Sequence, residues 1–358
     1  MLVRLIIAAV LATAPSAAPA QAAKGCANVG TPLKMLWGPA DLPNGKSAFP
    51  VYRELGVDVL QMQLPWSSVA LSRPADARSS GDPAYRWPAA VDVFVARAEE
   101  AGIRVALMVK STPGWANGDR GPAQAPNRDS DYADFLIAAS RRYPSVRHWM
   151  IWGEPTRSGN FTPMPENSRV GPRRYARLLD AAYGALKGES RRNKVIGGNT
   201  WTLGLVTPAD FLKWMRLPNG KPPRLDYYGH NPFSVRFPLL AKNTYYPGLR
   251  DMSDVDTLGR EVARAYRSRG RRPALWVSEF TVPSDKANHG FNIFVSRKEQ
   301  AKWLTGAFKA ARQSRCVAGM GWYSLLDQSA QTADPINSGL MTAVGKRKPA
   351  FAAFRRVL

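Results

Sequence analysis

The feature that most constrains the fold is a repeated alternation of apolar, strand-like runs with amphipathic, helix-like segments. The apolar runs cover residues 33–39, 57–66, 103–113, 146–155, 194–201, 225–233, 273–283 and 317–326. A segment with apolar residues at i, i+3, i+4 and i+7 follows each run, as expected for a helix with one buried face. Runs that are apolar at nearly every position are typical of parallel strands buried on both faces. Eight such units in succession predict an α/β fold, a closed (β/α)8 TIM barrel.

The same elements predict a single domain over residues 23–358, because no long linker and no larger repeat divides the chain. An open doubly wound sheet is the alternative arrangement of these elements. No G-x-G-x-x-G motif follows the run at 33–39, which disfavours a dinucleotide-binding version of that sheet. Loops rich in proline, glycine and polar residues follow several predicted strands, so these loops are expected on one rim of the barrel. They cover residues 72–86, 114–130, 156–172 and 233–253.

Residues 1–22 have the pattern of a secretory signal peptide. The basic start MLVR precedes the apolar stretch LIIAAVLATA, and Ala20 and Ala22 stand in the small-residue positions of a cleavage site. A membrane anchor is the alternative, but the apolar stretch is short for a bilayer span, and no other segment is long and apolar enough to cross a membrane. The pattern predicts a protein that is secreted, or held in the periplasm or cell envelope.

Two cysteines become informative if the chain is exported, because disulfides persist in oxidising compartments. Cys26 lies just before the first predicted strand and Cys316 just before the last. In a closed barrel these strands are neighbours, so the two cysteines would lie at the same end and could bridge. Two free thiols are the alternative.

The net charge of +23 is large, but the basic residues are scattered over several predicted helices. No basic stripe with interleaved aromatic residues and no nucleic-acid-binding module is present, so a specific nucleic-acid partner is not expected. A solvated basic surface is the simplest interpretation. An anionic polysaccharide or an anionic envelope surface is the alternative partner that this charge allows.

The most unusual residues are two glutamates that end apolar, tryptophan-containing runs. Glu154 lies in WMIWGEP (149–155) and Glu279 lies in ALWVSEF (274–280). An unpaired buried carboxylate is unfavourable, but in a barrel both glutamates would stand at the carboxyl ends of strands, where active sites form. Cleavage of a glycosidic bond uses two such carboxyl groups, and a separation of about 5–5.5 Å allows direct attack with retained configuration. Ion pairs with arginines are the alternative role for each glutamate.

These two segments resemble the clan A glycoside hydrolases. WGEP is similar to the W-N-E-P signature of that clan, and WVSEF is similar to its strand-seven segment. Within the clan the chain most resembles family 39, including β-xylosidases and bacterial exopolysaccharide endoglycosidases, with family 5 next. The resemblance implies that Glu154 is the acid/base and Glu279 the nucleophile. Gly153 departs from the signature, because the clan usually has an asparagine there that contacts the sugar 2-hydroxyl. Asn199 is a candidate substitute donor.

Further residues are expected to bind the carbohydrate substrate. DYYGHNPF resembles the strand-six segment of the clan, so His230 is expected to face the pocket and Tyr228 to hydrogen-bond a carboxylate. A structural role is the alternative for His230. Trp322 matches the tryptophan on the pocket floor of the clan, and Trp37 and Trp115 are the next candidates for stacking on sugar rings.

The predicted function is therefore a retaining glycoside hydrolase that needs no cofactor. The three histidines lack metal-ligand spacing, so no metal site is expected. Two alternatives stay open. One is a catalytically silent carbohydrate-binding barrel, suggested by Gly153, and the other is a transglycosidase that remodels an envelope glycan.

Overall fold

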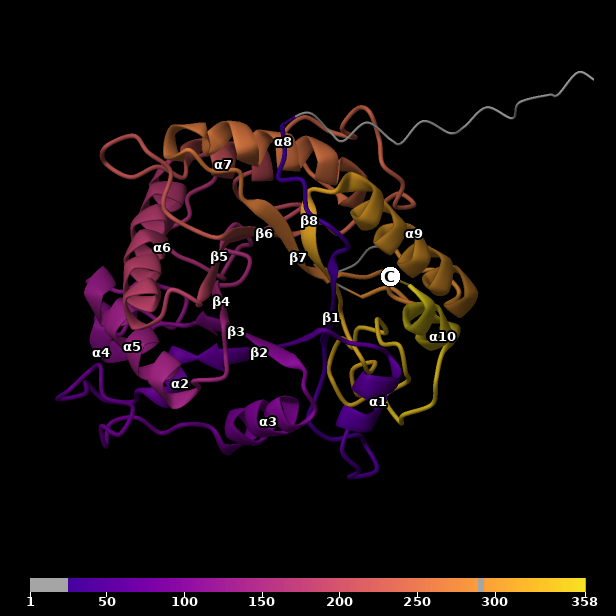
Figure 1. Cartoon of the computed structure of the whole chain (residues 1–358), viewed down its shortest axis with the longest axis horizontal. Coiled ribbons are helices and arrows are strands. Elements are labelled where there is room, and N and C mark those ends of the chain that lie inside the picture. The colour runs from indigo at the N-terminus through magenta and orange to yellow at the C-terminus, as the bar shows by residue number, and fades with distance from the viewer. Residues whose placement is uncertain (1–24, 289–292, 358) are drawn as a thin grey trace, which may run out of the picture.

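The computed structural model describes residues 25–288 and 293–357, and within them eight parallel strands close into one barrel (Figure 1). The strands are β1 (Leu33–Trp37), β2 (Val59–Pro65), β3 (Arg104–Lys110), β4 (His148–Ile151), β5 (Lys194–Trp201), β6 (Tyr227–Asn231), β7 (Ala274–Phe280) and β8 (Val317–Trp322). Each strand pairs with the next along the chain, and β8 pairs with β1. The predicted (β/α)8 fold is confirmed, and the predicted signal peptide at 1–22 lies outside the described residues.

The strands form where apolar side chains run almost without interruption. In β3, RVALMVK, the five residues from Val105 to Val109 are all buried. In a parallel barrel one face of each strand packs inside the barrel and the other packs under the helices, so both faces exclude water. The observed strands fall within the predicted runs, which extend beyond the strands into the loops of the rim.

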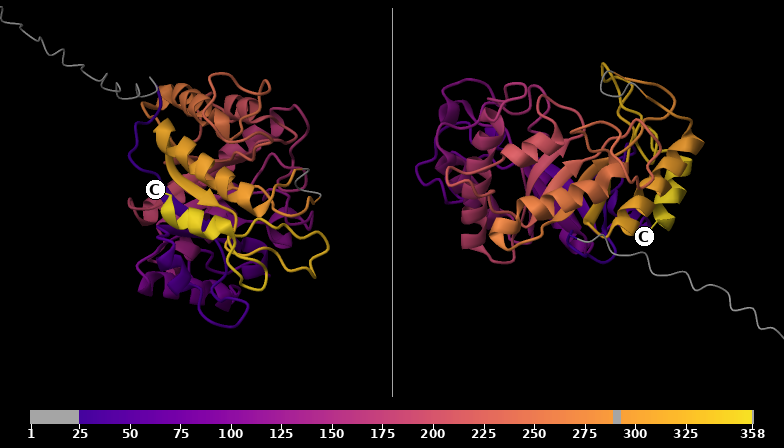
Figure 2. Two further views of the ribbon diagram at one scale, coloured as in Figure 1. Left: turned by 90° about the vertical axis from the view of Figure 1, so that its right-hand side faces the viewer. Right: turned by 90° about the horizontal axis from the view of Figure 1, so that it is seen from above.

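The helices lie outside the barrel and cover it on all sides (Figures 1 and 2). The main helices are α1 (Phe49–Glu54), α3 (Ala89–Glu100), α5 (Asp129–Arg142), α6 (Val170–Glu189), α7 (Pro208–Trp214), α8 (Val255–Ala265), α9 (Arg297–Ser314) and α10 (Pro349–Arg356). One follows each strand, as predicted. Additional short helices, too short for a periodic pattern to predict, occur at α2 (Trp66–Val69), α4 (Gly114–Asn117), η1 (Met252–Asp254) and η2 (Arg267–Arg269).

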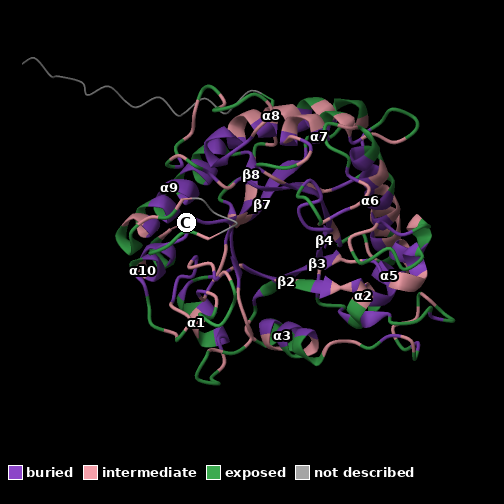
Figure 3. Ribbon diagram, turned by 180° about the vertical axis from the view of Figure 1, so that it is seen from behind, coloured by how far each residue is buried: buried purple, intermediate pink, exposed green. Residues whose placement is uncertain are grey.

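Buried residues, purple in Figure 3, lie in the strands and along parts of the helices, and their side chains form two clusters. A small cluster fills the barrel interior and includes Trp37, Met108, Met150 and Trp276. A much larger cluster packs between the sheet and the surrounding helices. Because side chains alternate between these clusters along a strand, a shift of one residue decides whether a side chain faces the barrel or the helices.

A disulfide joins Cys26 to Cys316, with the two Cα atoms 5.6 Å apart. Cys316 immediately precedes β8, and the strand register pairs Leu33 of β1 with Gly319 of β8. The predicted pairing of the cysteines is confirmed, and it follows from the closure of the barrel.

Within the described part of the chain, none of the helices combines the length and the apolar character that a membrane span requires.

Candidate active site

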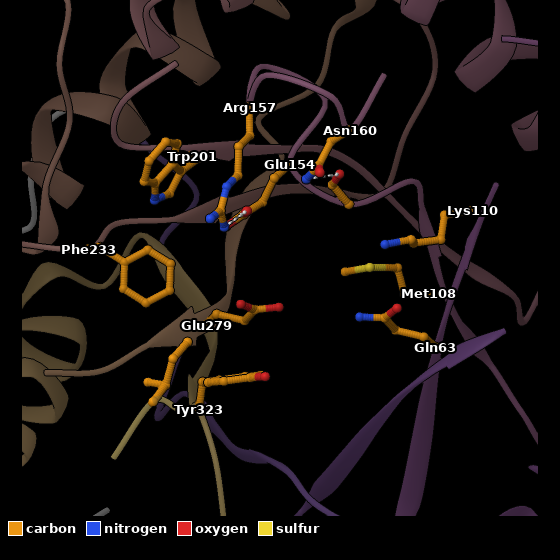
Figure 4. Close-up of a pocket in the computed structure, with 12 residues that line it drawn as sticks. Gln63, Met108, Lys110, Glu154, Arg157, Asn160, Trp201, Phe233, Glu279 and Tyr323 are labelled. Carbon is orange, nitrogen blue, oxygen red and sulfur yellow. Dashed lines mark hydrogen bonds and ion pairs between the residues drawn. The ribbon is translucent and has the colours of Figure 1, made fainter. Parts of the chain in front are cut away.

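A cavity of about 240 Å³ opens at the carboxyl ends of the strands (Figure 4). Side chains from β2, β3, β5 and β7 and from the loops after β4, β6 and β8 surround it. The lining residues are Gln63, Met108, Lys110, Gly153, Glu154, Arg157, Asn160, Trp201, Phe233, Glu279, Tyr323 and Ile336. Both predicted catalytic glutamates lie in this one cavity.

Glu154 follows β4 in a sharply turned segment. Trp152 has φ +64° and Glu154 has φ +43°, a left-handed conformation that non-glycine residues rarely adopt. The Glu154 carboxylate is buried and accepts two hydrogen bonds. Asn231 Nδ2 donates to Oε1 at 3.0 Å, and Arg157 Nη1 donates to Oε2 at 3.4 Å. Backbone strain of this kind tends to persist at functional sites, so the strained turn agrees with a site role for Glu154.

A hydrogen-bond relay fixes the orientation of Asn231. Ser278 Oγ donates to Asn231 Oδ1 at 2.7 Å, so the amide must present its Nδ2 to Glu154. All three side chains come from different strands or strand ends, and Asn231 is fully buried. The relay holds the Glu154 carboxylate in one position relative to β7.

Glu279 reaches the cavity through an irregularity in β7. The register between β7 and β8 shifts between Val277 and Phe280, the span that contains Glu279. Such a shift re-aims a side chain next to a site. Val277 and Phe280 pack in the outer layer under the helices, whereas Glu279 lines the cavity.

Glu279 has no partner of the kind that Glu154 has. Its carboxylate makes no hydrogen bond or ion pair to any residue in the described ranges. Burial and, to a smaller extent, the negative charge of Glu154 raise the pKa of Glu279 to about 8, although Lys110 and Arg157 oppose the shift. In the unliganded cavity Glu279 therefore keeps its proton to a higher pH than an ordinary glutamate.

The packing around Gly153 explains why this position has no side chain. A Cβ atom built at Gly153 would lie 2.5 Å from Sδ of Met108, well inside van der Waals contact. Met108 therefore occupies the space into which a side chain at position 153 would extend. The absence of the asparagine of the clan signature is therefore linked to the presence of Met108 on β3, because both side chains would need the same space.

The cavity wall formed by β2 and β3 carries two polar side chains that have no hydrogen-bond or ion-pair partner among the described residues. Gln63 on β2 lies opposite Met108 in the strand register, and Lys110 lies two residues further along the same face of β3. The Lys110 ammonium and the Gln63 amide make no hydrogen bond or ion pair with any residue of the described ranges. In Figure 4 both side chains point into the cavity from the side opposite Trp201 and Phe233.

The opposite wall is aromatic. The Arg157 guanidinium lies over the Trp201 ring, with Cζ 5.0 Å from the ring centroid, and it also contacts Glu154. Phe233 lies beside Trp201 at the cavity edge (Figure 4). Aromatic rings that line a cavity can stack on the apolar C–H face of a sugar.

None of the three predicted tryptophans lines the cavity. Trp37 packs inside the barrel, and its Nε1 donates to the carbonyl oxygen of Ser278 at 3.0 Å, which supports the segment of β7 next to Glu279. Trp115 packs edge-on against Trp66 and donates to the carbonyl oxygen of Ala70. Neither is brought to the two glutamates.

Trp322, predicted on the pocket floor, is fully buried in the outer layer under the helices, and its Nε1 donates to the carbonyl oxygen of Ser338. The next residue, Tyr323, lines the cavity instead. The motif indicated the right strand, but the alternation of side chains places the neighbouring aromatic ring at the site.

The polar residues predicted on β5 and β6 are used for structure. Nδ2 of Asn199 donates to the carbonyl oxygens of Ile151 and Trp152, so it braces the strained turn before Glu154 and does not reach the cavity. His230 is fully buried between Thr200 and the carbonyl oxygen of Arg250, and burial lowers its pKa to about 4. The Tyr228 ring is fully buried in the outer layer and contacts neither glutamate.

Several residues of the site were not predicted. They are Asn231, which donates to Glu154, and the cavity-lining residues Gln63, Met108, Lys110, Arg157, Asn160, Trp201, Phe233, Tyr323 and Ile336. The position of Lys110 at the end of a predicted strand was a usable signal for it. Residues in the loops, such as Arg157, had none, because loop conformation decides which of their side chains turn inward.

No cluster of three or more histidine, cysteine or acidic side chains that could hold a metal ion occurs in the described residues.

No protein-family model and no curated protein matches this chain. Solved structures do match. A family 39 glycoside hydrolase from the gut symbiont Bacteroides cellulosilyticus WH2 superposes with a TM-score of 0.64 at 18% identity, over 91% of this chain and 63% of its own. This chain has the fold of family 39 glycoside hydrolases.

Two further solved structures agree with this fold. A glucosidase from Croceicoccus marinus gives a TM-score of 0.64 at 17% identity, over 93% of this chain and 67% of its own. A monomeric β-xylosidase from Caulobacter crescentus CB15 gives 0.60 at 17% identity, over 94% and 69%. The chain thus spans about two thirds of the length of these proteins. The predicted resemblance to family 39 is confirmed at the level of the fold.

Proposed function

We propose that this chain is a retaining glycoside hydrolase of the clan A type, with Glu279 as nucleophile and Glu154 as acid/base. One observation carries the proposal. The two glutamates line a single cavity at the carboxyl ends of β4 and β7, close enough for the charge of Glu154 to raise the pKa of Glu279. The fold shared with solved family 39 glycoside hydrolases supports this assignment.

In the first step Glu279 attacks the anomeric carbon while the bond from that carbon to the leaving oxygen breaks. Glu154 gives its proton to the leaving oxygen. In the second step Glu154 removes a proton from water, the water attacks the glycosyl ester, and Glu279 leaves as a carboxylate. The relay from Ser278 through Asn231 keeps Glu154 at a constant position during both transfers.

The proposed reaction requires the shared proton on Glu154 and a charge on Glu279. The unliganded cavity favours the opposite distribution, because Asn231 and Arg157 donate to Glu154 while Glu279 has no donor. Arg157 is the weaker donor, at 3.4 Å, and it is exposed at the cavity mouth. Movement of Arg157 away from Glu154 when a leaving group binds would favour the reactive arrangement.

A catalytically silent carbohydrate-binding barrel is the second candidate, and a specific observation favours it. Met108 fills the space where the clan has its 2-hydroxyl ligand, and the raised pKa of Glu279 leaves the nucleophile largely protonated at neutral pH. Binding of an oligosaccharide without any product release would support this candidate.

The proposal is tested with activated 2-deoxy-2-fluoro glycosides of several configurations. A glycoside that the protein accepts should leave one glycosyl group on the chain, and peptide mapping by mass spectrometry should locate it on Glu279. Nuclear magnetic resonance of the first-formed product from an accepted substrate should show the starting anomer. A label on another residue, or an inverted first product, would contradict the proposed mechanism.

We also propose that the chain is exported through the signal peptide predicted at residues 1–22. The mature protein recovered from outside the cytoplasm should begin at Ala23, and N-terminal peptide mass spectrometry checks this. The Cys26–Cys316 disulfide supports an oxidising location. A mature protein that begins at Met1 and remains in the cytoplasm would contradict export.

A further inference from the structure

We propose that the cavity selects a sugar whose ring carries an anionic substituent, a carboxylate or a sulfate ester, and that the Lys110 ammonium binds it. This inference rests on the proposed function, since it names the class of substrate for the same site. The observations that carry it are the position of Lys110, its lack of a partner and the balance of charge in the cavity.

Lys110 is the last residue of β3, and its side chain points into the cavity (Figure 4). It is half-buried, yet it makes no hydrogen bond or ion pair with any described residue. A desolvated ammonium is unfavourable without an acceptor. Lys110 contrasts with Lys348, a fully buried lysine in this barrel that is paired with Asp327 at 2.9 Å. The protein therefore supplies a partner where a lysine is structural and supplies none at Lys110.

The other charges of the cavity do not neutralise Lys110. Arg157 lies on the opposite wall, where it contacts Glu154 and stacks on Trp201, and it adds a second positive charge to the cavity. The proposed reaction needs one proton on the pair of glutamates, which leaves one negative charge against two positive charges. The reactive cavity thus carries a net charge of about plus one, and a glycone with one negative charge would neutralise it.

The surroundings of Lys110 favour a substituent on the sugar ring over a distant charge. Met108 lies two residues before Lys110 on the same face of β3 and fills the space in front of Gly153. Gln63 on β2 adds an unpaired amide to the same wall. In Figure 4 the Met108 side chain lies between the Lys110 ammonium and the Gln63 amide, so the ammonium is the donor to the anionic substituent and Gln63 is a polar neighbour on the same wall. Charge-assisted hydrogen bonds from an ammonium to a carboxylate or sulfate oxygen are the strong ones.

The test uses pairs of 4-nitrophenyl glycosides that differ only in charge. One arm compares glucuronide with glucoside and galacturonide with galactoside. A second arm compares 2-, 3- and 6-sulfated glucosides with the unsulfated compound, so the two arms distinguish a carboxylate from a sulfate. We expect the best substrate to be anionic and to exceed its neutral partner in kcat/KM by about 10- to 100-fold, the value of one charged hydrogen bond.

Substitutions assign the preference to Lys110. Lys110→Met should remove most of the anionic-to-neutral ratio of kcat/KM, and Lys110→Arg should keep most of it. Lys242→Met is the matched control, because it removes an exposed lysine from the loop after β6 that does not line the cavity. Lys110 also lowers the pKa of Glu279, but that effect is common to both members of a pair and cancels in the ratio.

The outcomes separate this inference from the proposed function. If neutral glycosides are hydrolysed and their anionic partners are hydrolysed at an equal or lower rate, the inference is overturned, but the proposed hydrolase function is still supported. If no glycoside is hydrolysed, the preference for anionic sugars is tested by binding instead of by activity. Calorimetric titration with oligogalacturonate, oligoalginate, xylo-oligosaccharide and cello-oligosaccharide measures that binding. Binding of an anionic oligosaccharide that Lys110→Met weakens and Lys242→Met does not supports it. Binding of neutral oligosaccharides only, or of none, overturns it.

Discussion

Glu154 and Glu279 stand at corresponding strand ends, yet the protein surrounds the two carboxyl groups in opposite ways. Glu154 sits in a strained turn and accepts hydrogen bonds from Asn231 and Arg157. Glu279 sits within an irregular strand, has no donor among the described residues, and has its pKa raised. The comparison teaches that similar short motifs can produce one carboxyl group that accepts hydrogen bonds from protein donors and one whose pKa is raised by burial.

The hydrogen bonding of the two carboxyl groups suits a division of labour between nucleophile and acid/base, whereas the raised pKa of Glu279 opposes it until a substrate is bound. A carboxylate without donors is a stronger nucleophile once it ionises, because no hydrogen bond has to be broken during attack. A carboxyl group with a fixed position is a better proton donor and acceptor, because proton transfer depends on geometry. The predictions below test whether the different surroundings of Glu154 and Glu279 correspond to the roles of acid/base and nucleophile.

The largest expected effect comes from replacing the glutamates themselves. Glu279→Gln should lower kcat by about 10⁴-fold or more, because the covalent step is lost. Glu154→Gln should lower it by about 10²- to 10⁴-fold for poor leaving groups and much less for activated ones. Steady-state kinetics with aryl glycosides of graded leaving-group pKa measures both effects.

Azide should rescue the turnover of Glu154→Ala and give a glycosyl azide that retains the configuration of the substrate. In Glu279→Ala azide should not give a product of retained configuration. Glu166→Gln is the control, because Glu166 is exposed in the loop after β4 and does not line the cavity. Full activity in either active-site variant would contradict the assigned roles.

The next effect concerns the relay that supports Glu154. Asn231→Ala removes the 3.0 Å donor to Oε1 and should lower kcat for poor leaving groups by about 10-fold or more. Ser278→Ala should have a smaller effect in the same direction, because Ser278 acts only by orienting Asn231. Activated aryl glycosides should be nearly unaffected in both variants. Equal losses for good and poor leaving groups would show that the relay supports the whole site and not Glu154 in particular.

A moderate effect is expected on the ionisation of Glu279. Because the charge of Glu154 raises the pKa of Glu279, Glu154→Gln should lower that pKa below about 8. Burial is the larger cause and remains in the variant, so the pKa should stay above the ordinary value of 4.5. The rate of labelling by an activated fluoro glycoside should rise with pH through this pKa, and its midpoint should lie at lower pH in Glu154→Gln. An unchanged midpoint would mean that the two carboxyl groups do not interact.

The smallest effect is expected on stability. In the folded chain Glu279 keeps its proton to about pH 8, whereas the unfolded chain releases it near 4.5. The folded state therefore binds more protons between these values, so this group lowers the free energy of unfolding as the pH rises through that window. Glu279→Gln should raise the melting temperature by a few degrees at pH 9 and change it little at pH 5. Scanning calorimetry at both pH values checks this, and a lower melting temperature at pH 9 would contradict it.

The fold was predictable because its signal is spread over the whole chain. Each strand is a run of buried side chains, and a helix with one apolar face follows it, so local errors at the ends do not change the number or order of the units. The disulfide was predictable for the same reason, since closure of the barrel brings the segments before β1 and β8 together.

The site was predictable only in part. The two glutamates could be placed because a charged residue in an apolar run is a strong signal. The aromatic ring on β8 could not, since the choice between Trp322 and Tyr323 depends on a one-residue alternation. The role of Met108 was also not predictable, because Met108 on β3 and Gly153 after β4 are brought together only when the chain folds.

The loop after β8, which carries Tyr323 and Ile336, lies outside the ring of chain that the Cys26–Cys316 disulfide closes, but the active-site loops that follow the earlier strands, up to β7, lie within it. A protease that cuts any one of those loops therefore cannot release a fragment. The two pieces would stay linked, and the damage would become visible on a gel only after a reducing agent is added. If the chain is exported as proposed, this ring would keep both glutamates of a nicked molecule in one covalently linked particle.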